Sequence, residues 1–397
     1  MSTTIEEGQK YVMNTYSRFP LAIVKGEGVY VYDENNKKYL DMCAGIAVNA
    51  LGYGHKGLCE ALKEQVDTLM HISNLYYTPQ QVNAAKLLVE NSLFTKAFFC
   101  NSGAEANEAA LKLAKKFGKT KSPSCTKVVT MVHSFHGRTY GALGATGQEK
   151  YQKSFTPMLP GYSYAQYNDI ESLKALVDED TCAVLLEVIQ GEGGIIPGQK
   201  EYLQKVEALC KEKNVLMMID EVQTGIGRTG KLFAFENFDI HPDVVTLAKG
   251  LGGGVPIGAM LCNEKADVFE PADHASTFGG NPLVTTAAGV VLKELTETNL
   301  LEQVKEVGAY LESHLKTLQK EFSCIKEVRG IGLMQGIELT MPAKEVVASC
   351  IEKGMLVVGA GPQVVRFVPP LIITQEQIDE AIQILKKVLQ EVTKEGV

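Results

Sequence analysis

Short apolar runs alternate with helical patterns along the middle of the chain. Six of these runs are apolar at consecutive positions, which is typical of strands covered on both faces in a mainly parallel sheet. Amphipathic patterns over residues 104–117 and 201–213 predict helices between them. The alternation predicts an α/β fold with helices on both faces of a large sheet. The six predicted strands span residues 97–100, 127–132, 182–187, 215–220, 244–247 and 258–262.

The beginning of the chain follows a different pattern. Residues 28–33 alternate as a strand does, a polar turn follows at 34–37, and residues 38–41 return to the strand pattern. This order predicts a hairpin that precedes the main sheet. We expect residues 1–50 to form an N-terminal segment that joins a smaller domain.

That smaller domain is predicted from the end of the chain. A long amphipathic stretch over residues 283–322 leads into a new group of strands, and Thr374 with Gln377 has the spacing of a capping box that opens a last helix. We expect a large domain over residues 51–285 and a smaller α+β domain over 286–397. The new strands are predicted near residues 332–339, 355–358 and 364–368.

Composition excludes several classes of protein. A chain of 397 residues with 45% hydrophobic and 22% charged residues can bury a large core in two or three domains. The net charge of −8, without a long run of Lys or Arg, argues against nucleic acid as a partner. No apolar run is long enough for a bilayer, and the start MSTTIEEGQK lacks the pattern of a signal peptide, so we expect a cytoplasmic protein without a membrane partner. The nine cysteines include no CxxC pair, so we expect them to be reduced thiols and expect no metal site.

Polar residues directly after apolar runs are the first candidates for chemistry, because strand ends converge on the binding crevice of an α/β sheet. Four groups stand out: residues 101–104, residues 134–138, Asp220 and Lys249. The loop 101–104 lies between a strand and a helix, so its backbone N–H groups could hold a phosphate at the helix N-terminus. The alternative is an ordinary helix cap by Ser102.

Asp220 and Lys249 each end a strongly apolar run. A lysine among apolar neighbours can have a lowered pKa and act as a nucleophilic amine, and a buried carboxylate needs a positive or donor partner. The alternative is a buried ion pair between the two. Pyridoxal phosphate is a cofactor that needs all three types of group: a lysine for its aldehyde, an acid for its ring nitrogen and an anion site for its phosphate.

Six segments, in order along nearly the whole chain, resemble the class III (ornithine-type) aminotransferases. They are residues 101–107 (NSGAEAN), 135–138 (FHGR), 187–192 (EVIQGE), 220–230 (DEVQTGIGRTG), 248–258 (AKGLGGGVPIG) and 276–282 (STFGGNP). The resemblance implies a fold-type I transferase that depends on pyridoxal 5′-phosphate. Residues 44–49 and 51–55 are most similar to the members of the family that act on N-acetylornithine.

The resemblance also implies roles around the cofactor ring. Lys249 would hold the cofactor aldehyde covalently, and Asp220 would pair with the ring nitrogen. Phe135 and Val222 would pack on opposite faces of the ring, and Gln223 would reach its hydroxyl.

The same resemblance implies that residues of two subunits bind the phosphate group of the cofactor. Ser102, Gly103 and Ala104 would hold the phosphate from one subunit. Thr277 would contact it across a subunit boundary, which requires a homodimer.

Substrate contacts are expected from four further residues. Arg138 and Arg366 are candidate carboxylate clamps, because a guanidinium matches a carboxylate with two parallel hydrogen bonds. A surface ion pair is the alternative for each, although Arg366 lies in an apolar run where burial without a partner would be costly. Glu192 resembles the family's gate acid, which pairs with the second arginine while the ω-amine is bound and swings away for glutamate, and Ser276 is expected to touch the acylated substrate.

The resemblance implies a PLP-dependent transaminase of arginine biosynthesis. It would convert N2-acetyl-L-ornithine and 2-oxoglutarate into N-acetyl-L-glutamate 5-semialdehyde and L-glutamate, in two half-reactions at one site. Alternative donors are ornithine, succinyl-ornithine, succinyl-diaminopimelate and 4-aminobutyrate. An aminomutase or racemase and a non-catalytic relative are further alternatives. A nicotinamide-dependent dehydrogenase rests only on the GxGxxG pattern at 225–230, which is weak because no clear helix pattern follows it.

Overall fold

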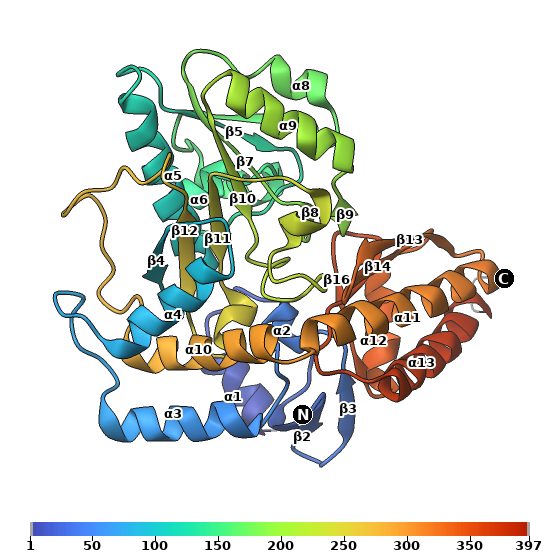
Figure 1. Cartoon of the computed structure of the whole chain (residues 1–397). Coiled ribbons are helices and arrows are strands. Elements are labelled where there is room, and N and C mark those ends of the chain that lie inside the picture. Colours follow the sequence, from blue (N-terminus) through green and yellow to red (C-terminus); the bar gives the residue numbers. More distant parts are fainter. Residues whose placement is uncertain (1–2, 395–397) are drawn as a thin grey trace.

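A seven-stranded sheet forms the centre of the protein, whose computed structural model describes residues 3–394 (Figure 1). Its strand order is β4-β12-β11-β10-β7-β5-β6, and only β12 runs antiparallel to its neighbours, β11 and β4. All six strands predicted from the apolar runs are present, so the prediction of a mainly parallel sheet is confirmed. The strands are β4 Lys96–Cys100, β5 Lys127–Met131, β6 Tyr162–Ala165, β7 Thr181–Leu186, β10 Leu216–Asp220, β11 Val244–Leu247 and β12 Gly258–Cys262.

Two hydrophobic cores lie on the two faces of this sheet. Alternate residues of each strand enter different cores: Leu216 and Met218 pack with α5 (Gly103–Lys119), whereas Met217 and Ile219 belong to the larger core with α9 (Lys200–Glu212). The two predicted helices 104–117 and 201–213 correspond to α5 and α9. Further helices around the sheet are α3 Lys56–Thr68, α4 Pro79–Glu90, α6 Tyr140–Ala145, α7 Glu149–Gln152, α8 Ile170–Lys174 and α10 Pro282–Glu297.

The predicted N-terminal hairpin is present as β2 (Tyr30–Asp33) and β3 (Lys38–Asp41), which pair antiparallel. One oxygen of Asp33 accepts from the backbone N–H groups of Asn35 and Lys37, at 2.8 and 2.9 Å, and fixes the turn. The hairpin belongs to a separate four-stranded sheet of order β1-β2-β3-β15. Its outer strands are β1 (Ile23–Glu27), which pairs with β2, and β15 (Met355–Leu356), which comes from far along the chain and pairs parallel with β3. The same region contains α1 Thr3–Tyr11 and α2 Ala44–Ala47.

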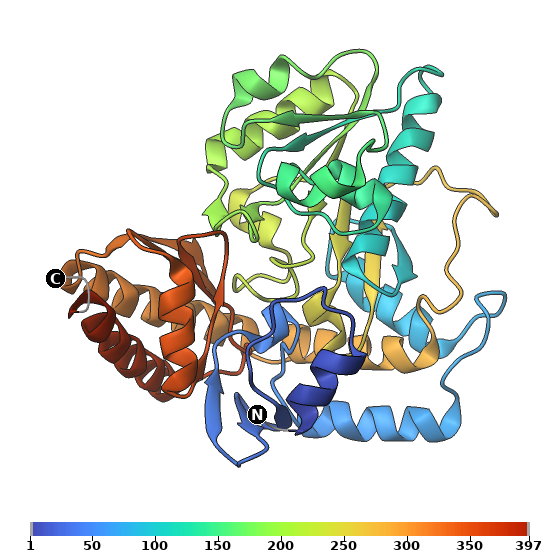
Figure 2. The ribbon, with the colours of Figure 1, turned by 180° about the vertical axis from the view of Figure 1, so that it is seen from behind.

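The C-terminal part forms a separate four-stranded sheet, called here the C-terminal sheet, with helices on one side, to the right in Figure 1 and to the left in Figure 2. Its strand order is β13-β14-β17-β16. The predicted stretch 283–322 is two helices, α10 and α11, because the chain breaks at Thr298 and Asn299. The elements are α11 Leu300–Glu321, β13 Ile325–Ile331, β14 Met334–Leu339, α12 Ala343–Glu352, β16 Val358–Gly359, β17 Val364–Phe367 and α13 Gln375–Lys394.

The capping box before α13 is formed as predicted. Thr374 N–H donates to Gln377 Oε1 at 2.9 Å, and Gln377 N–H donates to Thr374 Oγ1 at 3.4 Å. The proposed division at residues 50 and 285 remains our proposal. Short elements complete the fold: β8 Ile189–Gln190, β9 Ile196–Pro197 and the 3₁₀ turns η1 Lys153–Phe155, η2 Ala234–Phe238 and η3 Lys249–Gly252.

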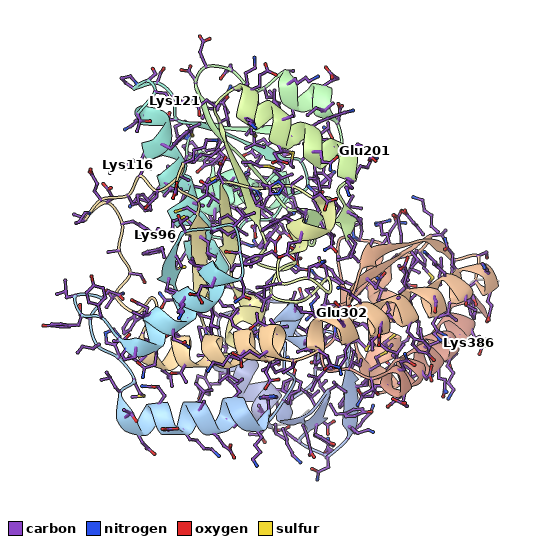
Figure 3. All side chains as sticks on the ribbon, viewed as in Figure 1. Lys96, Lys116, Lys121, Glu201, Glu302 and Lys386 are labelled. Atoms are coloured by element: carbon purple, nitrogen blue, oxygen red, sulfur yellow. The ribbon has the colours of Figure 1, made fainter. Side chains whose placement is uncertain are left out.

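Charged side chains lie around the outside of the molecule, as those labelled in Figure 3 do. Lys116 pairs with Glu270 and Asp273, and Lys386 pairs with Glu321. Among residues 3–394, no helix combines the length and apolarity needed to cross a membrane. The nine cysteines, all in the described part, are free thiols, as expected from their spacing.

Candidate active site

A cavity of about 460 Å³ opens where the loops after β4, β5, β10 and β11 converge. This is the strand edge at which the sequence predicts chemistry. Nine predicted site residues line it: Ser102, Gly103, Ala104, Phe135, Arg138, Asp220, Val222, Gln223 and Lys249.

The loop after β4 turns directly into α5. Ser102 caps this helix, because its Oγ accepts from Glu105 N–H at 3.2 Å, and Glu105 in turn accepts from Asn101 N–H at 2.6 Å. The cap that was the alternative interpretation is therefore formed. A Cβ atom on Gly103 would lie 2.6 Å from Val222, so only glycine fits between the loop and the end of β10. The capped helix start still directs its first N–H groups at the cavity end, where an anion is favoured.

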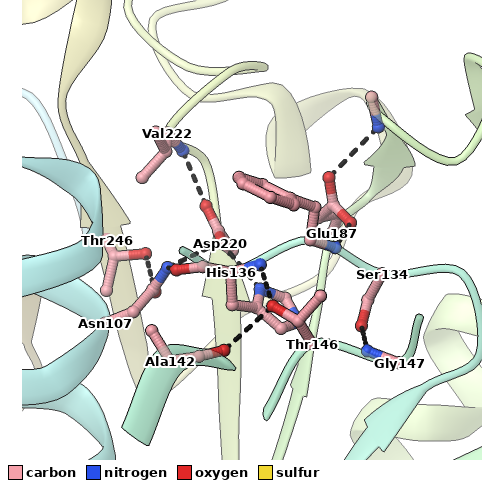
Figure 4. Close-up of polar contacts among 12 residues, drawn as sticks. Asn107, Ser134, His136, Ala142, Thr146, Gly147, Glu187, Asp220, Val222 and Thr246 are labelled. Atoms are coloured by element: carbon pink, nitrogen blue, oxygen red, sulfur yellow. Dashed lines mark hydrogen bonds and ion pairs between the residues drawn. The ribbon is translucent and has the colours of Figure 1, made fainter. Parts of the chain in front are cut away.

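Asp220, at the end of β10, is 3% exposed and is surrounded by hydrogen-bond donors (Figure 4). Its Oδ2 accepts from Asn107 Nδ2 and pairs with His136 Nδ1, both at 2.8 Å, and its Oδ1 accepts from Val222 N–H at 2.9 Å. Three donors therefore compensate for the burial of this carboxylate. The expected alternative, a direct ion pair between Asp220 and Lys249, is not formed.

A second layer of polar groups orients the partners of Asp220. Asn107 Oδ1 accepts from Thr246 Oγ1 at 2.8 Å, so its amide Nδ2 must face Asp220. His136 N–H donates to Thr146 Oγ1 at 2.9 Å. Sequence reasoning gave no role to Asn107, Thr246 or Thr146. Asn107 could have been noticed as a polar position on the buried face of the predicted helix 104–117.

Lys249 begins η3, immediately after β11, with a φ of +45°. This left-handed conformation is rare for a residue other than glycine and points to a functional constraint. Within residues 3–394, its side chain has no hydrogen bond or salt bridge. Burial, with the Arg366 charge as a second cause, lowers the pKa of Lys249 below its ordinary value of 10.5.

Arg366, on β17 of the C-terminal sheet, is 1% exposed and does not line the cavity itself, but it bonds to Gln223, which does. Its Nη1 donates to Glu192 Oε1 at 2.6 Å and to Gln223 Oε1 at 2.9 Å, while its Nε is buried without a partner in the described chain. Burial is the largest single influence on the pKa of Glu192 and raises it, but the charge of Arg366, the hydrogen bond from Arg366 and the charge of Lys249 act together and bring it below its ordinary value of 4.5. The structure thus joins buried Arg366 and Gln223 with partly buried Glu192 in one cluster beside the cavity.

Arg138 is exposed at the mouth of the cavity. Its guanidinium lies over the rings of Tyr151 and Phe135, with centroid distances of 4.0 and 5.5 Å. It forms no salt bridge with any residue in the described range, so the alternative of a surface ion pair is not observed.

Ser276 and Thr277 lie outside this cavity, in a neighbouring hollow of about 710 Å³. Ser276 Oγ accepts from Asn101 Nδ2 at 3.2 Å, next to the loop that caps α5. Thr277 is exposed. Within one chain, these two residues are therefore separate from the other predicted site residues.

Glu187 is a site residue to which sequence reasoning assigned no role, although it begins one of the six segments. It lines the cavity, is 5% exposed, and accepts with one oxygen each from Phe135 N–H and Gly191 N–H, both at 3.1 Å. Burial raises its pKa to about 7. The signal was an acid that directly follows an apolar strand, the same signal that identified Asp220.

The GxGxxG pattern at 225–230 has a packing role in this fold. It leads into turns and the short η2 rather than an α-helix. A Cβ atom would lie 2.6 Å from Leu295 at Gly227 and 2.3 Å from Lys305 at Gly230. The pattern therefore lacks the strand-to-helix setting that dinucleotide binding needs.

Comparison with known proteins agrees with this fold and site. The model of the family "Aminotransferase class-III" matches residues 11–389, so the chain belongs to the class III aminotransferases. A relative from Caldanaerobacter subterraneus, named acetylornithine aminotransferase, is 53% identical over 97% of this chain and 98% of its own length. A relative of the same name from Aquifex aeolicus is 51% identical over 96% of this chain and 100% of its own.

Solved structures extend the similarity to three dimensions. N-acetylornithine aminotransferase from Stenotrophomonas maltophilia has a TM-score of 0.85 at 35% identity, covering 98% of this chain and 99% of its own. Ornithine aminotransferase from Toxoplasma gondii has a TM-score of 0.94 at 34% identity, covering 98% and 95%. The fold is therefore that of the fold-type I enzymes, whose cofactor in this family is pyridoxal 5′-phosphate.

The cavity fits that cofactor. The space above Gly103 admits no Cβ atom, the Lys249 amine has no partner in the described chain, and the buried Nε2 of His136 has none either. The N-terminus of α5, the amine of Lys249 and the hydrogen-bonded carboxylate of Asp220 thus surround one space of adequate size.

Proposed function

We propose that this protein transfers the terminal amino group of N2-acetyl-L-ornithine to 2-oxoglutarate. The observation that carries the proposal is that Lys249, with a lowered pKa, and Asp220, with three donors, line the same cavity. Relatives at 45–53% identity that carry the name acetylornithine aminotransferase support the choice of substrate. Transamination needs both residue types within reach of one cofactor.

The residues around the cavity would hold pyridoxal phosphate by its ends and faces. Ser102, Gly103 and Ala104 would bind the phosphate at the start of α5, and Asp220 would face the ring nitrogen. Phe135 and Val222 would flank the ring, and Gln223 would reach its hydroxyl. When bound, the cofactor supplies an aldehyde that carries an amino group and a ring that withdraws electrons.

Lys249 would act as the general base and then as the general acid. Because its pKa is lowered, a larger share of its Nζ is unprotonated and able to accept a proton from the substrate carbon that bears the amine. The same Nζ would then return the proton. Asp220, held in place by Asn107 and His136, would keep a negative charge beside the ring nitrogen throughout.

Two arginines would distinguish the two substrates. Exposed Arg138 would bind a carboxylate present in both. Arg366 would remain paired with Glu192 while the acylated amine is bound, and would use its second face and unpaired Nε for the α-carboxylate of glutamate once Glu192 moves aside. Ser276 would contact the acylated substrate.

Substitution of Lys249 tests the chemistry. Lys249→Ala should abolish turnover and the imine that borohydride reduces, whereas wild-type protein should show both. Full turnover in the variant would contradict the role of Lys249. Rates on acetylated and free ornithine test the substrate, because free ornithine carries an extra ammonium charge. Equal rates on both would contradict acetylornithine as the preferred donor.

A homodimer is the second part of the proposal. Large apolar side chains are exposed along residues 66–82, among them Tyr77 at 96% and Leu75 at 85%, and Phe278 next to Thr277 is 59% exposed. Such a surface suits a second copy of the chain, which would bring Thr277 to the partner's phosphate site.

Mixed dimers test the exchange of Thr277. A dimer of one Lys249→Ala chain and one Thr277→Val chain has one intact site only if Thr277 serves the partner. Turnover near half of wild type, with one site per dimer that binds the cofactor with wild-type affinity, would support exchange between subunits. Activity at about half the level of the Thr277→Val homodimer, or a monomer in sedimentation, would contradict it.

A further inference from the structure

Arg366 is one of two arginines that lie in one row across the C-terminal sheet, with one strand between them. In the strand register, Arg329 on β13 is opposite Gly336 on β14, and Gly336 is opposite Arg366 on β17. Residues directly opposite one another project from the same face of a sheet. Arg329 and Arg366 therefore flank a position without a side chain.

The loop that carries Glu192 lies across this row. Ile195 sits over Gly336, since a Cβ atom there would be 3.0 Å from the Cβ of Ile195. On one side, Glu192 pairs with Arg366 at 2.6 Å. On the other side, Arg329 Nε donates to the carbonyls of Gly194 and Ile195 at 3.1 and 3.0 Å, and its Nη2 donates to Gly194 O at 2.9 Å.

The same loop is strained where Arg329 holds it. Ile195 is fully buried and has a φ of +53°, which is unusual for a β-branched residue and costs about 1–3 kcal/mol. Such a conformation persists only where surrounding contacts impose it. The three bonds from Arg329 fall on the two residues of the loop, Gly194 and Ile195, that have positive φ.

We propose that Arg329 is a positioning residue for the substrate switch: it fixes the backbone of residues 194–195, so that Glu192 alone moves when Arg366 changes partner. The inference deepens the proposed function, since it rests on Glu192 leaving Arg366 for glutamate. Arg329 itself does not line the cavity. Its remaining Nη1 is anchored by Glu327 and Glu338.

Loss of this anchor should favour one half-reaction over the other. Without Arg329, the loop can drift and the paired state of Glu192 and Arg366 becomes less populated. The acylated amine uses the paired state and glutamate the open one. Arg329→Gln should therefore lower the ratio of kcat/KM for N-acetylornithine to kcat/KM for glutamate about tenfold, within the usual range of coupling between sites.

The experiment measures each half-reaction separately on the cofactor-loaded protein, by its absorbance change. Lys326→Gln is the matched control, because Lys326 also pairs with Glu338 but does not touch the loop. Gly336→Ala is a second variant that keeps Arg329 and displaces Ile195 instead. We expect the ratio to fall in Arg329→Gln and Gly336→Ala and to stay unchanged in Lys326→Gln.

Hydrogen exchange provides a readout that does not depend on turnover. Amides in residues 189–197 of the substrate-free protein should exchange about tenfold faster in Arg329→Gln than in wild type or Lys326→Gln. Equal exchange, equal loss in both half-reactions, or the same effect in Lys326→Gln would each overturn the proposal. If wild type does not transaminate N-acetylornithine, the proposed function fails, while the exchange comparison still decides whether Arg329 holds the loop.

Discussion

Thr246 is predicted to stabilise the protein through one hydroxyl group. It is fully buried on β11, and its Oγ1 donates to Asn107 Oδ1 at 2.8 Å. Thr246→Val keeps the shape of the side chain but leaves Asn107 Oδ1 buried without a donor. The amide cannot escape by rotation, because its Nδ2 donates to Asp220 and to His136 O, and an oxygen in that place would face two acceptors.

The expected cost is that of one unsatisfied buried acceptor, about 1–3 kcal/mol. The sheet offers a matched control in Thr130, on β5. Thr130 is also fully buried, but its Oγ1 has no partner in the described chain. Thr130→Val therefore loses no hydrogen bond and removes a hydroxyl that is already unsatisfied, so it should be neutral or stabilising.

Thermal unfolding of the two variants, at one scan rate, compares them directly. For a chain of this length, 1–3 kcal/mol corresponds to a difference in midpoint of about 1–3 °C, with Thr246→Val the lower. Equal midpoints, or a lower midpoint for Thr130→Val, would refute the reasoning that the bond from Thr246 fixes the amide of Asn107.

Three further predictions follow from single groups. Burial raises the pKa of Glu187 from 4.5 to about 7, so the folded chain binds that proton more tightly than the unfolded chain. Between pH 4.5 and about 7, wild type should therefore lose stability relative to Glu187→Gln as the pH rises, when unfolding is measured against pH. A constant difference in stability across that window would contradict this. Arg138→Lys should raise KM for 2-oxoglutarate about tenfold in steady-state kinetics, because lysine lacks the forked guanidinium that binds a carboxylate with two parallel hydrogen bonds. An unchanged KM would exclude Arg138 as a clamp. Gly118→Ala would place a Cβ atom 2.0 Å from Cys125 O, so the free energy of unfolding in urea should fall by at least about 1–3 kcal/mol, and an unchanged midpoint would show that the backbone yields.

The strands of the large sheet could be predicted because burial on both faces leaves a continuous apolar run. β6 was missed because it lies at the sheet edge, where Tyr162 and Ser163 are only partly buried and Tyr164 is exposed. The direction of β12 could not be predicted either, since an apolar run looks the same in both directions. The predicted strand 355–358 divides between two sheets, β15 and β16, and nothing in the local pattern marks that division.

The site divides in the same way. Asp220 and Lys249 were predictable because a charged residue after an apolar strand has a high cost that function must justify. Asn107 and Thr246 were not, since a polar residue in a helix and a threonine in a strand are ordinary locally. Their significance comes from contacts across 113 and 139 residues, which only the fold brings together.

Backbone strain shows where the fold places its constraints. Three β-branched residues of the described chain have positive φ, namely Ile46, Ile195 and Ile226. Each flanks the site: Ile46 precedes Val48 of the cavity wall by two residues, Ile195 lies in the loop of Glu192, and Ile226 packs 3.5 Å from where a Cβ atom of Gly250 would be, next to Lys249. At about 1–3 kcal/mol each, these conformations are costs that packing around the cavity must offset. Because Ile195 and Ile226 are buried, the surrounding tertiary contacts impose their conformations, whereas Ile46 is 37% exposed and lies in a local turn in which its N–H donates to Cys43 O.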